Sequence, residues 1–294
     1  MDDLEPYMYG EGKIKLERGD FTLPPVLIGT IFYQGETLVN RNDPKEFNES
    51  KAKKRIDQHN QLTEKYKIPG LIEISGNTPE SMIAYLDFFL KSYSPPFVLG
   101  GTFEARAAGI AHLKERGIKP KDYIYNTISN LKNSKEVELL KKYKIESVVI
   151  LILGSESMTS TQRFNYLIQK TQPNDQNLIE GLKNLGVEKI WVDGGVTTLE
   201  SVVHILETQK MVSSSLKLPV GTAPTLFLFK YSSPRLNPKF HTKFRKATMM
   251  FPATWFSNFI FYGAIEDAKE CISAAYQTYE FKKIIQDRKM KFFE

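Results

Sequence analysis

Short apolar runs recur along the chain, and polar loops and amphipathic segments separate them. The run at residues 26–32 is almost unbroken, which is typical of a strand buried on both faces of a parallel sheet. Similar runs predict eight strands, at residues 26–32, 71–75, 96–99, 123–126, 147–153, 190–193, 218–221 and 258–263.

Helices are predicted between the strands. Thr78, Pro79 and Glu80 form a strong start signal, because threonine caps a helix and proline suits its first position. Other helices are expected at residues 49–66, 104–116, 135–144, 175–185 and 199–209, and from residue 265 onward. The polar stretch 154–174 indicates a functional loop or an unrecognised helix. Residues 222–250 mix aromatic residues, prolines and basic residues, and no strand is assigned there.

Eight strands that alternate with eight helical segments have the size and rhythm of a (β/α)8 TIM barrel. The alternative is an open doubly wound sheet, but no glycine fingerprint follows the first strand as a dinucleotide-binding sheet would need. We therefore predict an α/β fold with a single barrel domain at residues 25–294. Residues 1–24 are predicted to be a lead-in with a small hairpin, in which residues 14–17 pair with residues 21–23.

Composition narrows the functional classes. The chain has 294 residues, 41% of them hydrophobic, and its net charge of +6 is too modest to indicate nucleic-acid binding. No run of 18 apolar residues predicts a membrane span, and the acidic amino terminus does not resemble a secretory signal. Cys271 is the only cysteine, which excludes an internal disulfide and suits a reducing compartment. We expect a cytoplasmic protein.

Polar and small residues follow the predicted strands, where the active sites of such barrels lie. They are Thr30, Ser75, Asn77, Gly100, Gly101, Thr102, Asn126, Thr127, Gly154, Ser155, Asp193, Gly194, Gly221, Thr222, Tyr262 and Gly263. The histidines fall elsewhere, which argues against a zinc hydrolase. This mostly neutral rim with one carboxylate suits a neutral heterocycle that is rich in hydrogen-bond donors and acceptors.

Each of these residues also has a structural explanation. Asn126 could cap the following loop, and Asp193 before two glycines could be a turn former. Gly100 and Gly101 could form only a tight turn. Glu73, inside the second strand, could pair with a lysine within the barrel.

Several segments carry a resemblance to a known family. They are VLIGTIFY at 26–33, GNTPE at 76–80 with YLDF at 85–88, EARAAG at 104–109, IYNTI at 124–128, VD at 192–193 with VT at 196–197, LPVG at 218–221 and FYGAIEDA at 261–268. The chain resembles the H subunit of tetrahydromethanopterin S-methyltransferase and its relatives. These are pterin-binding barrels related to dihydropteroate synthase and to the methyltetrahydrofolate:corrinoid methyltransferases.

The resemblance implies methyl transfer between a methyl-tetrahydropterin, of the tetrahydromethanopterin or tetrahydrofolate type, and the cobalt of a corrinoid on a partner protein. Such a role belongs to one-carbon metabolism related to methanogenesis. The resemblance assigns Asn126 to catalysis at the methylated nitrogen and Asp193 to pterin binding. The other expected substrate-binding residues are Asn77, Glu73, Gly100, Gly101, Thr102, Gly154, Gly221 and Thr222. The family also implies a homodimer.

The chain departs from the family at several rim positions. Relatives end the third strand with Asp-Ser, and that aspartate also binds the pterin, whereas this chain has Gly100 and Gly101. Relatives have an asparagine at the position of Gly154, and a His-Asn pair at about Thr225 and Leu226. On this basis Asp193 is expected to lack the carboxylate that would face it.

Two other functions fit the same scaffold. One is an enzyme that acts on another methylated amine or heterocycle, and the other is a non-catalytic binding protein. The basic and aromatic stretch 230–246 is either a docking face for the corrinoid protein or an amphipathic helix, and its pattern favours the helix.

Overall fold

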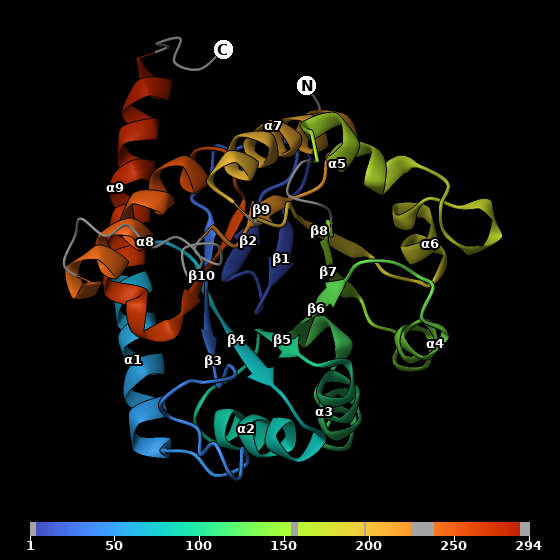
Figure 1. The fold of residues 1–294 in the computed structure, drawn as a ribbon, viewed down its shortest axis with the longest axis vertical. Helices are drawn as coiled ribbons and strands as arrows, with labels where there is room; N and C mark the ends of the chain where they lie inside the picture. Colours follow the sequence, from blue (N-terminus) through green and yellow to red (C-terminus); the bar gives the residue numbers. More distant parts are fainter. Residues whose placement is uncertain (1–3, 154–157, 197, 225–237, 289–294) are drawn as a thin grey trace.

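Eight parallel strands form a closed barrel with helices around it (Figure 1). The computed structural model describes residues 4–153, 158–196, 198–224 and 238–288, without the side chains of residues 199–200 and 238–245. Around the barrel the strand order is β10-β3-β4-β5-β6-β7-β8-β9, and β9 pairs with β10. The predicted (β/α)8 barrel is therefore confirmed.

The barrel strands follow the apolar runs of the sequence. They are β3 (Val26–Ile31), β4 (Gly70–Gly76), β5 (Phe97–Gly101), β6 (Tyr123–Ile128), β7 (Ser147–Leu151), β8 (Lys189–Asp193), β9 (Val220–Thr222) and β10 (Phe259–Ala264). Most of their residues are buried and none is exposed, because the inner face packs in the barrel and the outer face packs against helices.

The helices lie outside the strands (Figure 1). They are α1 (Glu49–Tyr66), α2 (Pro79–Ser92), α3 (Phe103–Glu115), α4 (Ser134–Tyr143), α5 (Ser160–Ile168), α6 (Leu178–Asn184), α7 (Leu199–Leu216), α8 (Pro238–Trp255) and α9 (Ala268–Asp287). Short 3-10 turns η1 (Pro120–Asp122), η2 (Pro173–Asp175) and η4 (Ile265–Asp267) join them to their neighbours. In the described part of the chain, no helix is both long and apolar enough to cross a lipid bilayer.

Helices occur in both stretches for which the sequence leaves two alternatives open. Helix α5 lies within 154–174, and Thr159 and Gln162 form the capping box that begins it. Helix α8 begins at Pro238, so the end of the stretch 230–246 is helical, whereas residues 230–237 lie outside the described part. Helix α6 is shorter than expected at 175–185, and α7 extends beyond the expected 199–209.

A hairpin closes the amino-terminal end of the barrel. It pairs β1 (Tyr7–Tyr9) with β2 (Ile14–Leu16), so the predicted pairing of residues 14–17 with 21–23 is wrong. The chain turns at Gly10 and Gly12, whose positive φ angles suit glycine. Tyr9, Ile14 and Leu16 pack with the inward residues of the strands, and Figure 1 shows the hairpin over the middle of the ring.

One buried hydrogen-bond network ties this hairpin to the barrel. The Nε1–H of Trp191 donates to the Tyr9 hydroxyl at 2.8 Å, and that hydroxyl also bonds Ser147 Oγ at 3.1 Å. We expect Tyr9→Phe to lower the free energy of unfolding by about 1–3 kcal/mol, because the buried indole N–H loses its acceptor. Denaturant unfolding measures this loss.

Tyr7→Phe is the matched control. The Tyr7 ring packs beneath the Arg18 guanidinium, with 5.1 Å from Cζ to the ring centroid, and the substitution keeps that ring. Its effect should stay within about 0.5 kcal/mol. Equal losses in the two variants would contradict the role of the Tyr9 hydroxyl.

Candidate functional site

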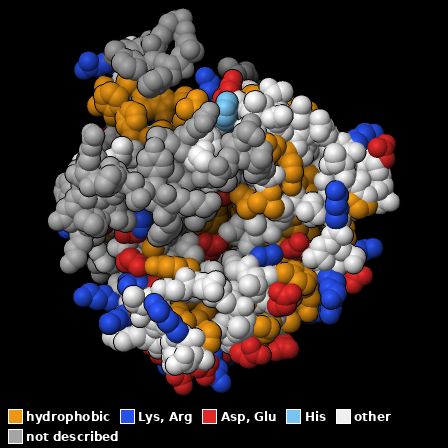
Figure 2. Space-filling model, in the orientation of Figure 1, with side chains coloured by type: hydrophobic (Ala, Val, Ile, Leu, Met, Phe, Trp, Pro, Cys, Tyr) orange, Lys and Arg blue, Asp and Glu red, His pale blue; other side chains and the backbone are white. Residues whose placement is uncertain are grey.

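The carboxyl ends of the strands bring a small set of polar side chains together. Side chains alternate along each strand, and those of Val98, Ile124 and Trp191 pack in the inner cluster. Positions two residues further on therefore face inward as well, and they are Gly100, Asn126 and Asp193. Figure 2 shows acidic side chains near the middle of the face presented, where the surface is hollowed.

Glu73 links three strands at this end of the barrel. Its Oε2 accepts a hydrogen bond from Thr30 Oγ1 on β3 at 2.5 Å, and its Oε1 accepts one from Asn126 Nδ2 on β6 at 2.5 Å. Its partners are therefore a hydroxyl and an amide, and the expected lysine partner is wrong. Burial raises the pKa of the Glu73 carboxyl, whereas these two hydrogen bonds and the charge of Arg106 oppose the rise.

Asp193 ends β8 as a buried carboxyl group. Its Oδ1 accepts the backbone N–H of Gly195 at 2.9 Å. Burial raises the pKa of Asp193 to about 7, the bond from Gly195 opposes this rise, and the charge of Glu73 adds to it. Strand β5 offers no carboxylate to Asp193, because Gly100 is the residue there, and the acid whose charge acts on Asp193 is Glu73 on β4.

Two buried arginines that were not predicted as site residues hold the backbone beneath these side chains. Arg163 on α5 donates from Nη1 to the carbonyl oxygens of Gly194 at 2.9 Å and Gly195 at 3.3 Å, which fixes the loop after Asp193. Arg106 on α3 donates to the Gly101 carbonyl and pairs with Glu136 at 2.9 Å. Because a guanidinium group presents several donors, each arginine can bond more than one of the groups around it.

The capping box of α5 was the sequence signal for Arg163, because it shows that the polar stretch 154–174 contains a helix. Arg106 lies in the segment EARAAG, which carried the resemblance, but nothing in that segment shows where its side chain points.

Other predicted residues have structural roles at the rim. Gly101 has a φ of +99°, and a Cβ there would lie 1.9 Å from the Gly76 carbonyl oxygen, so glycine is needed. Thr102 caps α3 by accepting the N–H of Ala105 at 3.2 Å, and its hydroxyl donates to the Asn77 carbonyl at 3.1 Å. Asn77 therefore takes part through its backbone.

The two predicted residues on β9 face opposite sides. A Cβ on Gly221 would meet the Phe259 ring, which packs inside the barrel, so Gly221 faces inward. Thr222 pairs with Ile260, which packs in the outer cluster, so the alternation places Thr222 on the outward side. Gly154 lies outside the described residues.

The loop after β3 is fixed beside the rim by charged groups. Arg55 on α1 forms ion pairs with Glu36 and with Glu266, the latter at 3.3 Å. The Tyr33 hydroxyl donates to Glu266 at 2.8 Å. Burial and the charge of Glu266 raise the pKa of Glu36 to about 7, although Arg55 opposes the rise.

No histidine is among the hydrogen-bond partners found for Glu73, Asn126 and Asp193 in the described part of the chain. His59 bonds the Tyr262 hydroxyl through Nδ1 at 2.7 Å, and burial lowers its pKa to about 3, so it is a neutral core residue. Among described side chains, no group of three or more His, Cys, Asp and Glu could hold a metal ion.

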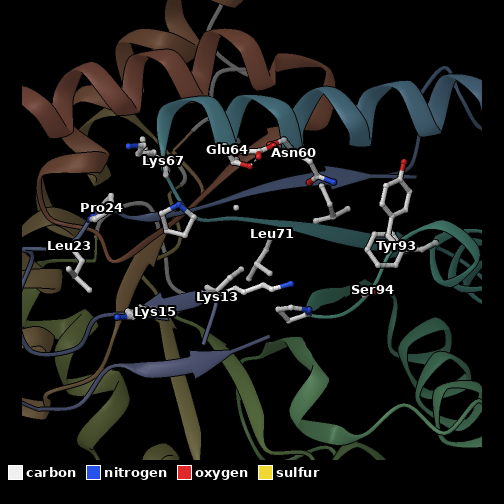
Figure 3. Close-up of a pocket in the computed structure, with 18 residues that line it drawn as sticks. Lys13, Lys15, Leu23, Pro24, Asn60, Glu64, Lys67, Leu71, Tyr93 and Ser94 are labelled. Atoms are coloured by element: carbon white, nitrogen blue, oxygen red, sulfur yellow. Dashed lines mark hydrogen bonds between the residues drawn. The ribbon is translucent and has the colours of Figure 1, made fainter. Parts of the chain in front are cut away.

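A separate hollow of about 730 Å³ lies at the other end of the barrel. It opens between the hairpin, the start of β4 and the last turns of α1 and α2, as Figure 3 shows for Lys13, Leu71, Lys67 and Tyr93. It is therefore distinct from the cluster around Asp193.

The chemistry of the strand-end cluster would suit a heterocycle that carries N–H donors and a developing charge. A carboxylate such as that of Asp193 can accept hydrogen bonds from two parallel N–H groups of a ligand. An amide such as that of Asn126 can both donate and accept hydrogen bonds. The cluster offers no serine, cysteine or lysine as a nucleophile among these described side chains.

Known proteins match the chain in sequence. A family model, "Tetrahydromethanopterin S-methyltransferase MtrH subunit", matches residues 9–290. The H subunit of tetrahydromethanopterin S-methyltransferase from Methanothermobacter marburgensis is 28% identical over 212 residues, which are 71% of this chain and 67% of that protein. The H subunit of the putative methyltransferase mtx from Methanosarcina barkeri is 29% identical over 180 residues, covering 60% of this chain and 57% of that protein.

Solved structures match the fold. A dihydropteroate synthase from Xanthomonas albilineans has a TM-score of 0.62 and 12% identity, over 96% of this chain and 99% of that one. The Yersinia pestis enzyme with a sulfonamide has a TM-score of 0.59 and 12% identity, over 90% of this chain and 96% of that one. The predicted dihydropteroate synthase-like barrel is thereby confirmed.

The family model covers nearly the whole chain, from the hairpin to the last helix. This chain therefore belongs to the tetrahydromethanopterin S-methyltransferase MtrH subunit family, a family of methyltransferase subunits.

Proposed function

We propose that this protein binds an N-methylated tetrahydropterin at the carboxyl end of the barrel and passes its methyl group to the cobalt of a corrinoid on a partner protein. The observation that carries the proposal is that Asp193 and Asn126 lie on the inward face at the ends of β8 and β6, where the buried Glu73 accepts a hydrogen bond from Asn126. The names of the relatives support it, because they describe subunits that act with tetrahydromethanopterin.

The cluster fits a pterin in its chemistry. A pterin ring presents an amino group and a ring N–H side by side, and a carboxylate accepts such a pair in bidentate fashion. Asp193 has the position for this role, since it lies on the inward face and its loop is fixed by Gly195 and Arg163. Gly221 beside it keeps the adjacent strand free of a side chain that would narrow the pocket.

Asn126 is the residue that we expect to form a hydrogen bond with the methylated nitrogen. A tertiary amine is a poor leaving group until its nitrogen receives a proton or a strong hydrogen bond, so charge must be stabilised there. The Asn126 amide is held by Glu73 at 2.5 Å, which places a fixed dipole in the pocket. A cobalt(I) corrinoid would supply the nucleophile when bound, and the barrel needs none of its own.

The direct test mixes the purified protein with a cob(I)alamin source and a methyl-tetrahydropterin. We expect the absorbance of methylcobalamin to appear with either the tetrahydromethanopterin or the tetrahydrofolate derivative. A reaction without protein is the control. Absence of conversion with both derivatives, while both still bind, would favour a non-catalytic binding role. Absence of binding as well would overturn the proposal.

We expect a corrinoid-carrying protein to dock over the carboxyl ends of the strands, because the methyl group must reach cobalt there. We also expect the chain to form a homodimer through its barrel helices, which light scattering of the purified protein would test.

A further inference from the structure

Glu73 reaches across a neighbouring strand. Its own strand, β4, pairs with β3 and β5. One partner, Thr30, lies on β3, but the other, Asn126, lies on β6, which is the next strand beyond β5. The Glu73 side chain therefore passes over β5 to reach Asn126.

The residue of β5 beneath this crossing is Gly100. A Cβ at that position would lie 2.2 Å from Glu73 Oε1, 2.9 Å from its Cδ and 3.1 Å from its Cγ. The φ angle of Gly100 is not in the left-handed region, unlike that of Gly101. Its backbone therefore permits other residues, and the space that Glu73 occupies is what requires glycine.

Glu73 and Asp193 both face the inside of the barrel, because each lies two residues beyond an inward-facing residue, Leu71 or Trp191. Glu73 is 7% exposed and Asp193 is 6% exposed, and the negative charge of Glu73 favours the protonated form of Asp193. The two buried acids therefore both point into the barrel near its carboxyl end, and Asn126 donates a hydrogen bond to one of them.

We propose that Glu73 and Gly100 form one functional unit, in which Glu73 supplies from β4 the acid that faces Asp193 and Gly100 leaves the space for it. On the proposed function, Glu73 is then a positioning residue that orients the Asn126 amide and a further acceptor for N–H groups of the tetrahydropterin. Each carboxylate oxygen has two lone pairs, so Oε1 and Oε2 can accept from a ligand as well as from Asn126 and Thr30.

This unit predicts that the acid can be moved between strands. An aspartate carboxyl lies one bond beyond its Cβ, so the carboxyl group of an aspartate at position 100 would lie close to where Glu73 Oε1 and Cδ lie now. Glu73→Ala removes the acid and opens a space. Gly100→Asp puts a second acid into an occupied space. The double variant E73A/G100D again has one acid here, and the aspartate side chain at position 100 fills the space that the Glu73 side chain leaves.

The test titrates the full-length wild type, E73A, G100D and E73A/G100D by calorimetry with 5-methyl-tetrahydrofolate and methyl-tetrahydromethanopterin. Each single variant should bind its probe at least about 10-fold more weakly, because one charged hydrogen-bond acceptor is lost or misplaced. The double variant should recover to within about threefold of the wild type. Glu73→Gln, which keeps the size and removes the charge, should weaken binding with little change in thermal stability.

A second measurement separates the steric coupling from ligand binding. Thermal unfolding without ligand should show that Gly100→Asp destabilises the Glu73 protein more than the E73A protein. If the wild type binds a probe but the double variant binds no more tightly than the singles, this inference is overturned and the proposed function stands. If the wild type binds neither probe, the proposed function fails and the inference fails with it.

Discussion

Replacing Asn126 with alanine should lower the turnover of methyl transfer about 100-fold or more, which is the usual cost of losing one fixed hydrogen-bonding group at a developing charge. The affinity for the pterin should change much less, because Asp193 remains in place. The measurement is the initial rate of methylcobalamin formation at saturating methyl-tetrahydropterin, with the dissociation constant taken separately by calorimetry.

Asn60→Ala is a suitable control for this rate. Asn60 is an exposed asparagine on α1 that lines the hollow at the opposite end of the barrel. Its loss should leave turnover unchanged. If the Asn126 variant turned over at close to the wild-type rate, Asn126 would have no part in the chemical step, and its bond to Glu73 would be structural.

Replacing Asp193 with asparagine should weaken binding of the tetrahydropterin by about 10- to 100-fold, since a charged hydrogen-bond acceptor is exchanged for a neutral amide. The amide oxygen can still accept the Gly195 N–H, so the loop should keep its shape. Calorimetry gives the affinity, and an unchanged dissociation constant would contradict the assignment of Asp193 to the pterin.

The same experiment has a pH dependence with a defined sign. Burial raises the pKa of Asp193 to about 7, and only the ionised form accepts the N–H donors of a pterin in bidentate fashion. Affinity of the wild type should therefore increase about tenfold between about pH 6 and about pH 8, in proportion to the ionised fraction. The Asp193→Asn variant should lose this pH dependence of the affinity. Any pH dependence that it keeps would come from the titration of Glu73.

The barrel could be predicted because its strands are buried on both faces and leave apolar runs in the sequence. The predicted hairpin has the wrong partner strand because Tyr7–Tyr9 and residues 21–23 are both short apolar stretches, and the glycines at 10 and 12 are the better turn signal. Helix α5 is difficult to predict because its sequence is mostly polar. Its buried residues include Arg163, which a hydrophobic pattern does not mark as buried.

The candidate site could be predicted only in part. Asp193 and Asn126 can be found because a strand end is located from its apolar run, and each strand can be examined alone. The contact between Glu73 and Asn126 spans a whole strand, and it depends on the missing side chain at Gly100. The hydrophobic pattern of a single segment cannot indicate a contact between two strands. In the sequence, Gly100 therefore indicates only that the aspartate found at this position in relatives is missing.

The amino-terminal hairpin has a consequence for the order of events. Tyr9, Ile14 and Leu16 pack into the amino-terminal end of the barrel, so in the described part of the chain this end is blocked by side chains. Under the proposed function, the pterin and the corrinoid protein must then both approach from the carboxyl ends of the strands. The small molecule then enters first, the large partner covers it, and the demethylated pterin leaves only after the partner has withdrawn.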